Sequence, residues 1–116
     1  MAVKLNQRGF DNAKSRVKEK RVVLDVMDDW SEHRPLAAQE NEFIEKHGFD
    51  EYGKWHLGVD DEMGENTKGR YKFPYGDFEN VHRCGVIAAE VRAAQRKYTD
   101  VEVAAAHLHG MLDELM

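Results

Sequence analysis

The sequence has little cysteine and proline and no long hydrophobic run. Its single cysteine, Cys84, cannot form an internal disulfide, which fits a reducing compartment, so we expect a cytoplasmic protein. The apolar runs reach at most about five residues, which excludes a membrane span. The first ten residues contain no apolar core of the kind that a secretory signal needs, and we expect no such signal.

Length and composition indicate one globular domain over residues 1–116. Hydrophobic residues make up 41% of the chain and charged residues 34%, which is the balance of a soluble domain with a well-solvated surface. A chain of this size buries enough surface to fold without metal or disulfides. We expect residues 1–5 and 113–116 to fray at the two ends.

Charge is unevenly distributed along the chain. The formal net charge is −5, yet residues 4–21 hold seven bases and two acids, and residues 67–100 hold seven bases and four acids. The acids concentrate in residues 22–66. Either the oppositely charged segments attract one another in the fold, or a basic face contacts nucleic acid. We favour the first interpretation, because a net acidic chain is unusual for a protein that binds by neutralising phosphates.

Apolar spacing predicts about four helices. They cover residues 7–20, 35–47 and 78–97, and a last helix begins near residue 99. Asn6 and Asp77 are the predicted N-caps of the first and third helices. Gly48 is predicted to end the second helix with a positive φ. Thr99 and Glu102 have the spacing of a capping box at the start of the last helix.

Two short segments alternate apolar and polar residues. They cover residues 54–59 and 70–73, and an acidic loop separates them, so a two-stranded ribbon is predicted. A lone ribbon is marginally stable, so we expect it to pack on the last two helices, which are predicted to form an antiparallel hairpin. The expected fold class is α+β and mostly helical. Val22–Asp25 fits either a helix or a strand.

The histidines and the cysteine raise the question of a metal site. His107 and His109 are two residues apart, as are His82 and Cys84. On the helices expected there, such pairs point about 200° apart and cannot hold one ion. No zinc-finger or HExxH spacing is present, so we expect no metal and no cofactor. Cys84 lies on the apolar face of its expected helix, which favours an inert buried thiol over a nucleophile activated by His82 or His107.

The densest aromatic stretch mixes rings with bases, over residues 70–78. Such a mixture can stack on single-stranded nucleic acid, or the alternation can place Tyr71 and Phe73 in the core. We treat this stretch and its neighbours as a possible interaction patch. Its members are Trp55, His56, Arg70, Tyr71, Lys72, Tyr75 and His82.

Four segments together resemble a family of short bacterial proteins. The segments are DDWSEH (28–33), WHLGVD (55–60), RYKFPYGDF (70–78) and VHR (81–83). The resemblance covers nearly the whole chain, from about Phe10 to Leu112, and implies a bacterial, cytoplasmic, stand-alone domain. It brings no catalytic residue, cofactor or partner with it.

Three hypotheses of function remain. The leading one is a non-enzymatic domain that acts through protein contacts, as a homodimer or with another protein. The second is nucleic-acid binding, and the third is a small-molecule binder or enzyme with a pocket between the ribbon and the helices. Nucleic acid would use Lys14, Lys18, Arg21, Arg70, Lys72 and Tyr75, and the pocket would use Trp55, His56, Tyr71 and His82.

Overall fold

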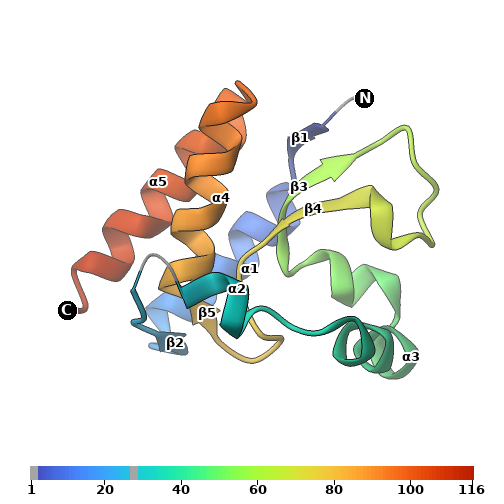
Figure 1. The fold of residues 1–116 in the computed structure, drawn as a ribbon, viewed down its shortest axis with the longest axis horizontal. Helices are drawn as coiled ribbons and strands as arrows, with labels where there is room; N and C mark the ends of the chain where they lie inside the picture. Colours follow the sequence, from blue (N-terminus) through green and yellow to red (C-terminus); the bar gives the residue numbers. More distant parts are fainter. Residues whose placement is uncertain (1–2, 27–28) are drawn as a thin grey trace.

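The computed structural model describes residues 3–26 and 29–116 and has an α+β architecture (Figure 1). Within these residues five α-helices surround a three-stranded sheet, and a two-stranded sheet lies beside them. The strands are β1 (Val3–Leu5), β2 (Val22–Val23), β3 (His56–Asp60), β4 (Tyr71–Pro74) and β5 (Val81–His82). The helices are α1 (Gln7–Lys18), α2 (Trp30–His33), α3 (Ala37–Gly53), α4 (Arg83–Gln95) and α5 (Thr99–Asp113).

The expected ribbon is part of a larger antiparallel sheet. Its strands are ordered β1-β3-β4, and β3 pairs on one side with β1, Val3 opposite Asp60, and on the other with β4, His56 opposite Pro74. Every residue of β3 is buried, as expected for a central strand. The expectation that residues 1–5 fray is wrong for Val3–Leu5, because backbone pairing to β3 holds them in place.

A second sheet decides the conformation of the segment after α1. Val22–Val23 form strand β2, which runs parallel to β5, with Val22 opposite Val81. The predicted start of the third helix at residue 78 is wrong for the same reason, since Val81–His82 are committed to this pairing and α4 begins at Arg83. Asp77 caps no helix. Its Oδ1 instead accepts the N–H groups of Glu79 and Asn80 in the turn before β5.

The last two helices form the expected hairpin. α4 and α5 lie side by side and run in opposite directions (Figure 1). Small buried residues on both helices, among them Ala89 and Ala105, allow the close approach. The predicted capping box is wrong, because Tyr98 is the N-cap and no side chain caps α5. Asp100 instead accepts the N–H of Leu5 and so ties α5 to β1.

Gly48 has the predicted positive φ, 85°, and its backbone is non-helical (ψ 170°), so the first helical segment of α3 ends there as predicted. The chain resumes a helical turn after this kink, and α3 extends to Gly53. Asn6 is the N-cap of α1 as predicted, although its side chain does not cap the helix. Its Nδ2 donates instead to the carbonyl groups of Gly53 and His56, which fastens α1 to the end of α3 and the start of β3.

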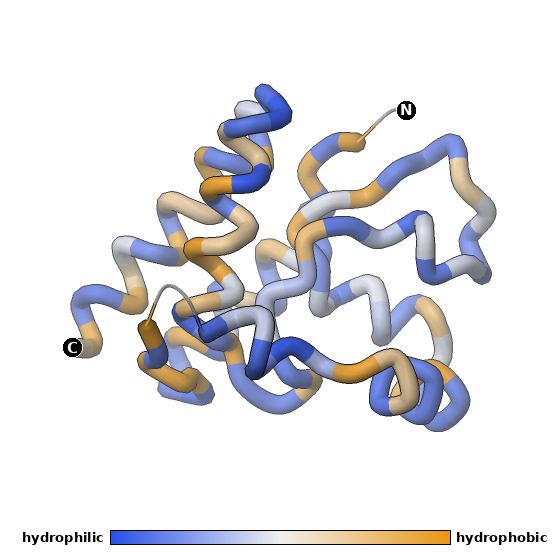
Figure 2. The backbone as a smooth tube through the Cα atoms, viewed as in Figure 1, coloured by the Kyte–Doolittle hydropathy of each residue, from blue (hydrophilic) through white to orange (hydrophobic). Residues whose placement is uncertain are grey.

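The core lies between the sheet, α1 and the α4–α5 hairpin. Leu57, Tyr75 and Leu108 are fully buried there, as are many smaller side chains. The sheet therefore packs on the hairpin as the sequence predicted. Hydrophilic residues dominate the loop between β3 and β4, which projects away from this core (Figure 2).

Candidate functional site

Four side chains of metal-binding type converge at the base of α4. They are Asp25, His33, His82 and Cys84, hereafter the Asp25 cluster. One ligand atom from each of them lies within 4.8 Å of all the others. The side chains of Asp25 and His82 are 5% and 8% exposed, Cys84 is fully buried, and His33 is 36% exposed. The cluster is thus a largely buried site with one histidine at its rim.

Backbone pairing brings the four residues together. Asp25 follows β2, whose partner strand β5 contains His82. Cys84 is the second residue of α4, and His33 ends the short helix α2. The expectation that His82 and Cys84 point apart is wrong, because His82 is not helical. Its backbone is extended (φ −96°, ψ 125°) as the N-cap of α4, so the step of about 100° between helical residues does not separate its side chain from that of Cys84.

Asp25 is the hub of the cluster. Its Oδ1 accepts the backbone N–H of Cys84 at 2.7 Å, and its Oδ2 lies 2.7 Å from Nδ1 of both His33 and His82. Burial raises the pKa of this carboxyl, but the hydrogen bonds from Cys84, His33 and His82 outweigh it and lower the pKa to about 2. Asp25 is therefore a carboxylate with one oxygen directed at two imidazole rings.

His82 lies between two carboxylates. Its Nδ1 faces Asp25 and its Nε2 lies 2.8 Å from Oδ2 of Asp77. Burial alone would lower the pKa of His82, but the hydrogen bonds to Asp77 and Asp25 raise it above its usual value. Because the turn amides of Glu79 and Asn80 hold Asp77 by its other oxygen, the orientation of the His82 ring is set from outside the cluster.

Trp30 covers the cluster from the side of α2. Its indole centroid lies 5.9 Å from that of the His82 ring. The indole approaches α4 closely at Gly85, where a Cβ atom would come within 2.9 Å of the ring and equally close to the carbonyl oxygen of Tyr75. The glycine after Cys84 thus lets the Trp30 ring seal one wall of the site.

The arrangement does not suit a cysteine nucleophile. Burial and the nearby Asp25 carboxylate raise the pKa of the Cys84 thiol, whereas a nucleophile requires a lowered value. Sγ of Cys84 and the Asp25 carboxylate both approach the same nitrogen of His33, Nδ1, at 3.9 and 2.7 Å. A catalytic triad needs the thiol and the carboxylate on opposite nitrogens of the imidazole ring.

The donor set suits a tetrahedral transition-metal ion. Zinc binds cysteine sulfur at about 2.3 Å and histidine nitrogen at about 2.0–2.1 Å, so ligand atoms around it lie roughly 3.3–3.7 Å apart. The separations within the cluster run from 2.7 Å to no more than 4.8 Å and so bracket that range, and the ligand atoms would move by roughly 1 Å to bind one ion. The hydrogen bond from His82 to Asp77 is the outer contact that ligating histidines usually make. The residues present therefore fit a metal ion.

The residues of the predicted interaction patch are neighbours in the structure, but most of their side chains are buried. Trp55, His56, Tyr75 and His82 are buried, whereas Arg70, Tyr71 and Lys72 are partly exposed. His56 lies beside Tyr71, with ring centroids 5.9 Å apart, and Trp55 lies 5.6 Å from Tyr75. His82 belongs to the separate Asp25 cluster.

Several residues of the nucleic-acid hypothesis make contacts within the protein itself. The hydroxyl of Tyr75 is buried 2.6 Å from the carbonyl oxygen of Lys54. Arg70 donates to the carbonyl group of Met63, and Lys14 lies over the ring of Phe10. Lys72 borders a groove described below.

Comparisons with protein-family models, with curated proteins and with solved structures return no match to this chain. Within the residues that the structure describes, no helix combines the length and the apolar character needed to cross a membrane.

His82 and Cys84 stand out in the sequence as possible partners in one site, whereas Asp25 and His33 do not. The H-x-C spacing indicates a shared site only where the two residues do not lie in one helix, and His82 precedes α4. The deciding fact, the pairing of β2 with β5, joins segments about sixty residues apart.

Proposed function

We propose that the protein binds a zinc ion at the Asp25 cluster. The supporting observation is the convergence of a carboxylate oxygen, two imidazole nitrogens and a thiol sulfur on one point. Sulfur and nitrogen donors favour zinc over calcium or magnesium, which take oxygen ligands. The ion would bind Oδ2 of Asp25, Nδ1 of both histidines and Sγ of Cys84.

The proposed ion has a structural role. Four protein ligands close a tetrahedral shell, whereas a catalytic zinc ion keeps one position open for water. With a thiolate and a carboxylate, the site carries two negative charges that balance the charge of the ion. Because the ligands come from the segment after β2, from α2, from β5 and from α4, the ion would join elements that are distant in sequence. Zinc binding would therefore stabilise Asp25 and α2 against the base of α4.

Metal titration of the whole chain tests this proposal. Cobalt(II) is added to metal-free protein as a spectroscopic substitute for zinc. We expect one equivalent to bind, to give a thiolate-to-cobalt charge-transfer band with intense visible bands of tetrahedral cobalt, and to be displaced by zinc. Zinc is also expected to raise the melting temperature, and a chelator to reverse that change.

Two variants and one control locate the ion. His33→Gln removes the partly exposed ligand and leaves the buried part of the cluster unchanged, so it is expected to fold and to lose zinc affinity by at least about tenfold. Cys84→Ser is expected to abolish the charge-transfer band. His47→Gln changes an exposed histidine on α3 and is the matched control. Wild-type-like binding by His33→Gln, or no charge-transfer band in the wild-type protein, would refute the proposal.

The remaining expectations from the sequence are also proposals. A bacterial source, a cytoplasmic location and action through protein contacts rest on the resemblance and the composition. Exposed apolar side chains that support protein contacts include Leu24 and Val26, which flank Asp25, and Val103 on α5. Light scattering across a range of concentrations tests self-association, and a strict monomer would count against a homodimer.

A further inference from the structure

A groove with an apolar floor and a basic rim runs along one face of α4. Its volume is about 530 Å³, within the range of sites that hold one small organic molecule. β4 borders it on one side, and α2 with the residue after it borders one end. Trp30, Phe73 and Ile87 are buried residues of its floor. The groove shares Trp30 with the wall of the Asp25 cluster, but none of the four side chains of the cluster lines it.

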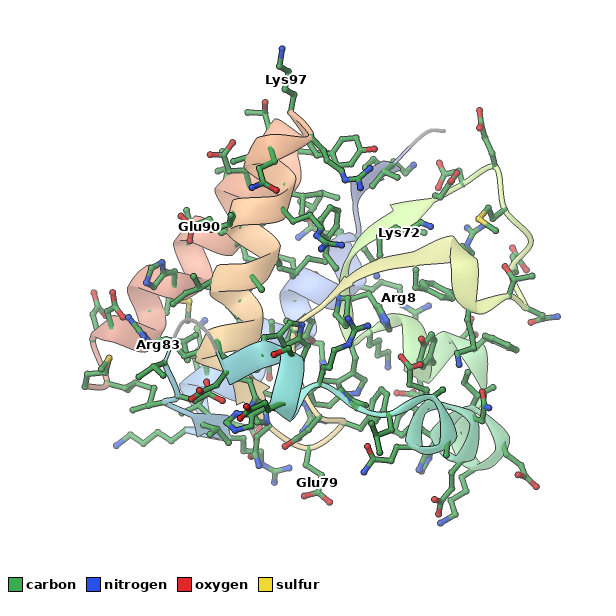
Figure 3. The ribbon with its side chains drawn as sticks, viewed as in Figure 1. Arg8, Lys72, Glu79, Arg83, Glu90 and Lys97 are labelled. Atoms are coloured by element: carbon green, nitrogen blue, oxygen red, sulfur yellow. The ribbon has the colours of Figure 1, made fainter. Side chains whose placement is uncertain are left out.

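The rim of the groove has charge of one sign. Its cations are Arg34, Lys72, Arg92 and Arg96, and none of the lining residues in the described part of the chain is Asp or Glu. Glu90, the acid nearest along α4, instead lies 2.9 Å from His109 of α5. Figure 3 shows Glu90 on the α5 side of α4, away from Lys72. This concentration of positive charge lies on a chain whose net charge is −5.

The four cations of the rim have no carboxylate partner among the residues that the structure describes. Within residues 3–26 and 29–116 none of them forms an ion pair, whereas Lys4, Lys46 and Arg83 each lie within 3 Å of a carboxylate. Unpaired cations beside a low-dielectric apolar surface attract anions more strongly than those in open solvent. Arginine side chains in particular bind carboxylate and phosphate groups through paired N–H donors.

The floor carries a further mark of a binding site. Phe73 has a φ of 61°, in the left-handed region that residues with side chains rarely adopt. Its ring packs against Tyr98, with centroids 6.0 Å apart, so the strained residue contributes to the wall of the groove. Residues held in such conformations concentrate at ligand sites.

We infer that this basic groove binds a small organic anion that has an apolar body and a carboxylate, phosphate or sulfonate group. The apolar floor would hold the body, and the arginines and lysine of the rim would hold the charged group. The volume fits one small molecule better than a polymer, and the charge complementarity selects an anion over a neutral ligand of the same shape.

A pair of fluorescent probes tests both halves of this inference. Anilinonaphthalene sulfonate has an aromatic body and one negative charge, and N-phenyl-1-naphthylamine has nearly the same body without charge. We expect the sulfonate to bind the wild-type protein with one-to-one stoichiometry and at least about tenfold more tightly than the neutral probe. Added salt is expected to weaken the binding of the sulfonate probe and to leave the binding of the neutral probe unchanged. Equal affinities for the two probes would overturn the charge assignment.

Matched variants locate the probe. Val91 lines the groove and is 40% exposed, so Val91→Glu places a negative charge there without disturbing the core. Val103 lies on α5 outside the groove and is 62% exposed, and Val103→Glu is its control. We expect about a tenfold loss of sulfonate affinity for Val91→Glu and for the double variant Arg92→Ala, Arg96→Ala. Equal effects of Val91→Glu and Val103→Glu would refute the location.

Competitors identify the class of occupant. Decanoate is expected to displace the sulfonate probe, and decanol, which lacks the charge, is expected not to. A dodecameric oligothymidylate and an oligoglutamate peptide represent nucleic acid and acidic peptides. Displacement of the probe by either polymer at lower concentrations than by decanoate would overturn the assignment to a small molecule.

Discussion

Replacing Gly9 by alanine tests how closely α1 approaches β3. Gly9 is a buried residue of α1, and a Cβ atom there would lie 1.8 Å from the carbonyl oxygen of His56 and 3.1 Å from Nδ2 of Asn6. Carbon and carbonyl oxygen rarely approach closer than about 3.3 Å, so the helix would have to retreat by roughly 1.5 Å. The retreat would also stretch the hydrogen bond from Asn6 to His56.

The magnitude follows from these contacts. Overpacking costs about 1–3 kcal/mol, and a lost hydrogen bond costs about 1 kcal/mol. Alanine in place of glycine returns up to about 1 kcal/mol of helix propensity. We therefore expect Gly9→Ala to lower the free energy of unfolding by about 1–3 kcal/mol, which corresponds to a fall in melting temperature of roughly 5–15 °C.

Gly110 provides the matched control. It lies in α5, and a Cβ atom there would meet no other atom within 4 Å. Gly110→Ala is therefore expected to raise the free energy of unfolding by the full difference in helix propensity between alanine and glycine, up to about 1 kcal/mol. Urea unfolding followed by circular dichroism, in the presence of a chelator, measures both variants. If Gly9→Ala were as stable as the wild type, the close contact between α1 and β3 would be refuted.

Three further substitutions test the core and the wall of the candidate site. Burial lowers the pKa of His56 to about 4 from 6.5, so the unfolded state binds more protons between these values. The contribution of His56 to the free energy of unfolding is fully present above pH 6.5 and falls by about 3 kcal/mol toward pH 4. Urea unfolding at pH 7 and at pH 4.5 should therefore show a smaller fall in this free energy for His56→Gln than for the wild type. An equal loss in both proteins would contradict this. Tyr75→Phe is expected to cost about 1 kcal/mol, because it removes a buried hydroxyl that donates to the Lys54 carbonyl and accepts from the Asn12 amide, while these two groups stay bonded to each other. A thermal melt unchanged from the wild type would contradict that assignment. Gly85→Ala is expected to cost about 1–3 kcal/mol and to change tryptophan fluorescence, since the added methyl group meets the Trp30 ring. An unchanged spectrum would show that the ring lies elsewhere.

Local patterns predicted much of the fold. The helix at 7–20, the alternating segments at 54–59 and 70–73, and the C-terminal hairpin all correspond to observed elements, because their apolar spacing matches one period over many residues. Predictions failed where a distant segment competed with a local signal. Asp77 and Thr99 look like helix caps in sequence, yet α4 and α5 begin at Arg83 and at Thr99 itself.

The candidate site illustrates the same division. The sequence alone determined the α+β composition, the amphipathic C-terminal helices and the presence of two histidines and one cysteine with suitable chemistry. Tertiary structure decided that Asp25 and His33 lie against His82 and Cys84, because parallel pairing of β2 with β5 is a long-range hydrogen-bonding choice that no local period encodes. It also decided that four cations from three separate elements border one groove. Periodicity reports which face of one element is apolar, whereas a binding site depends on which elements meet.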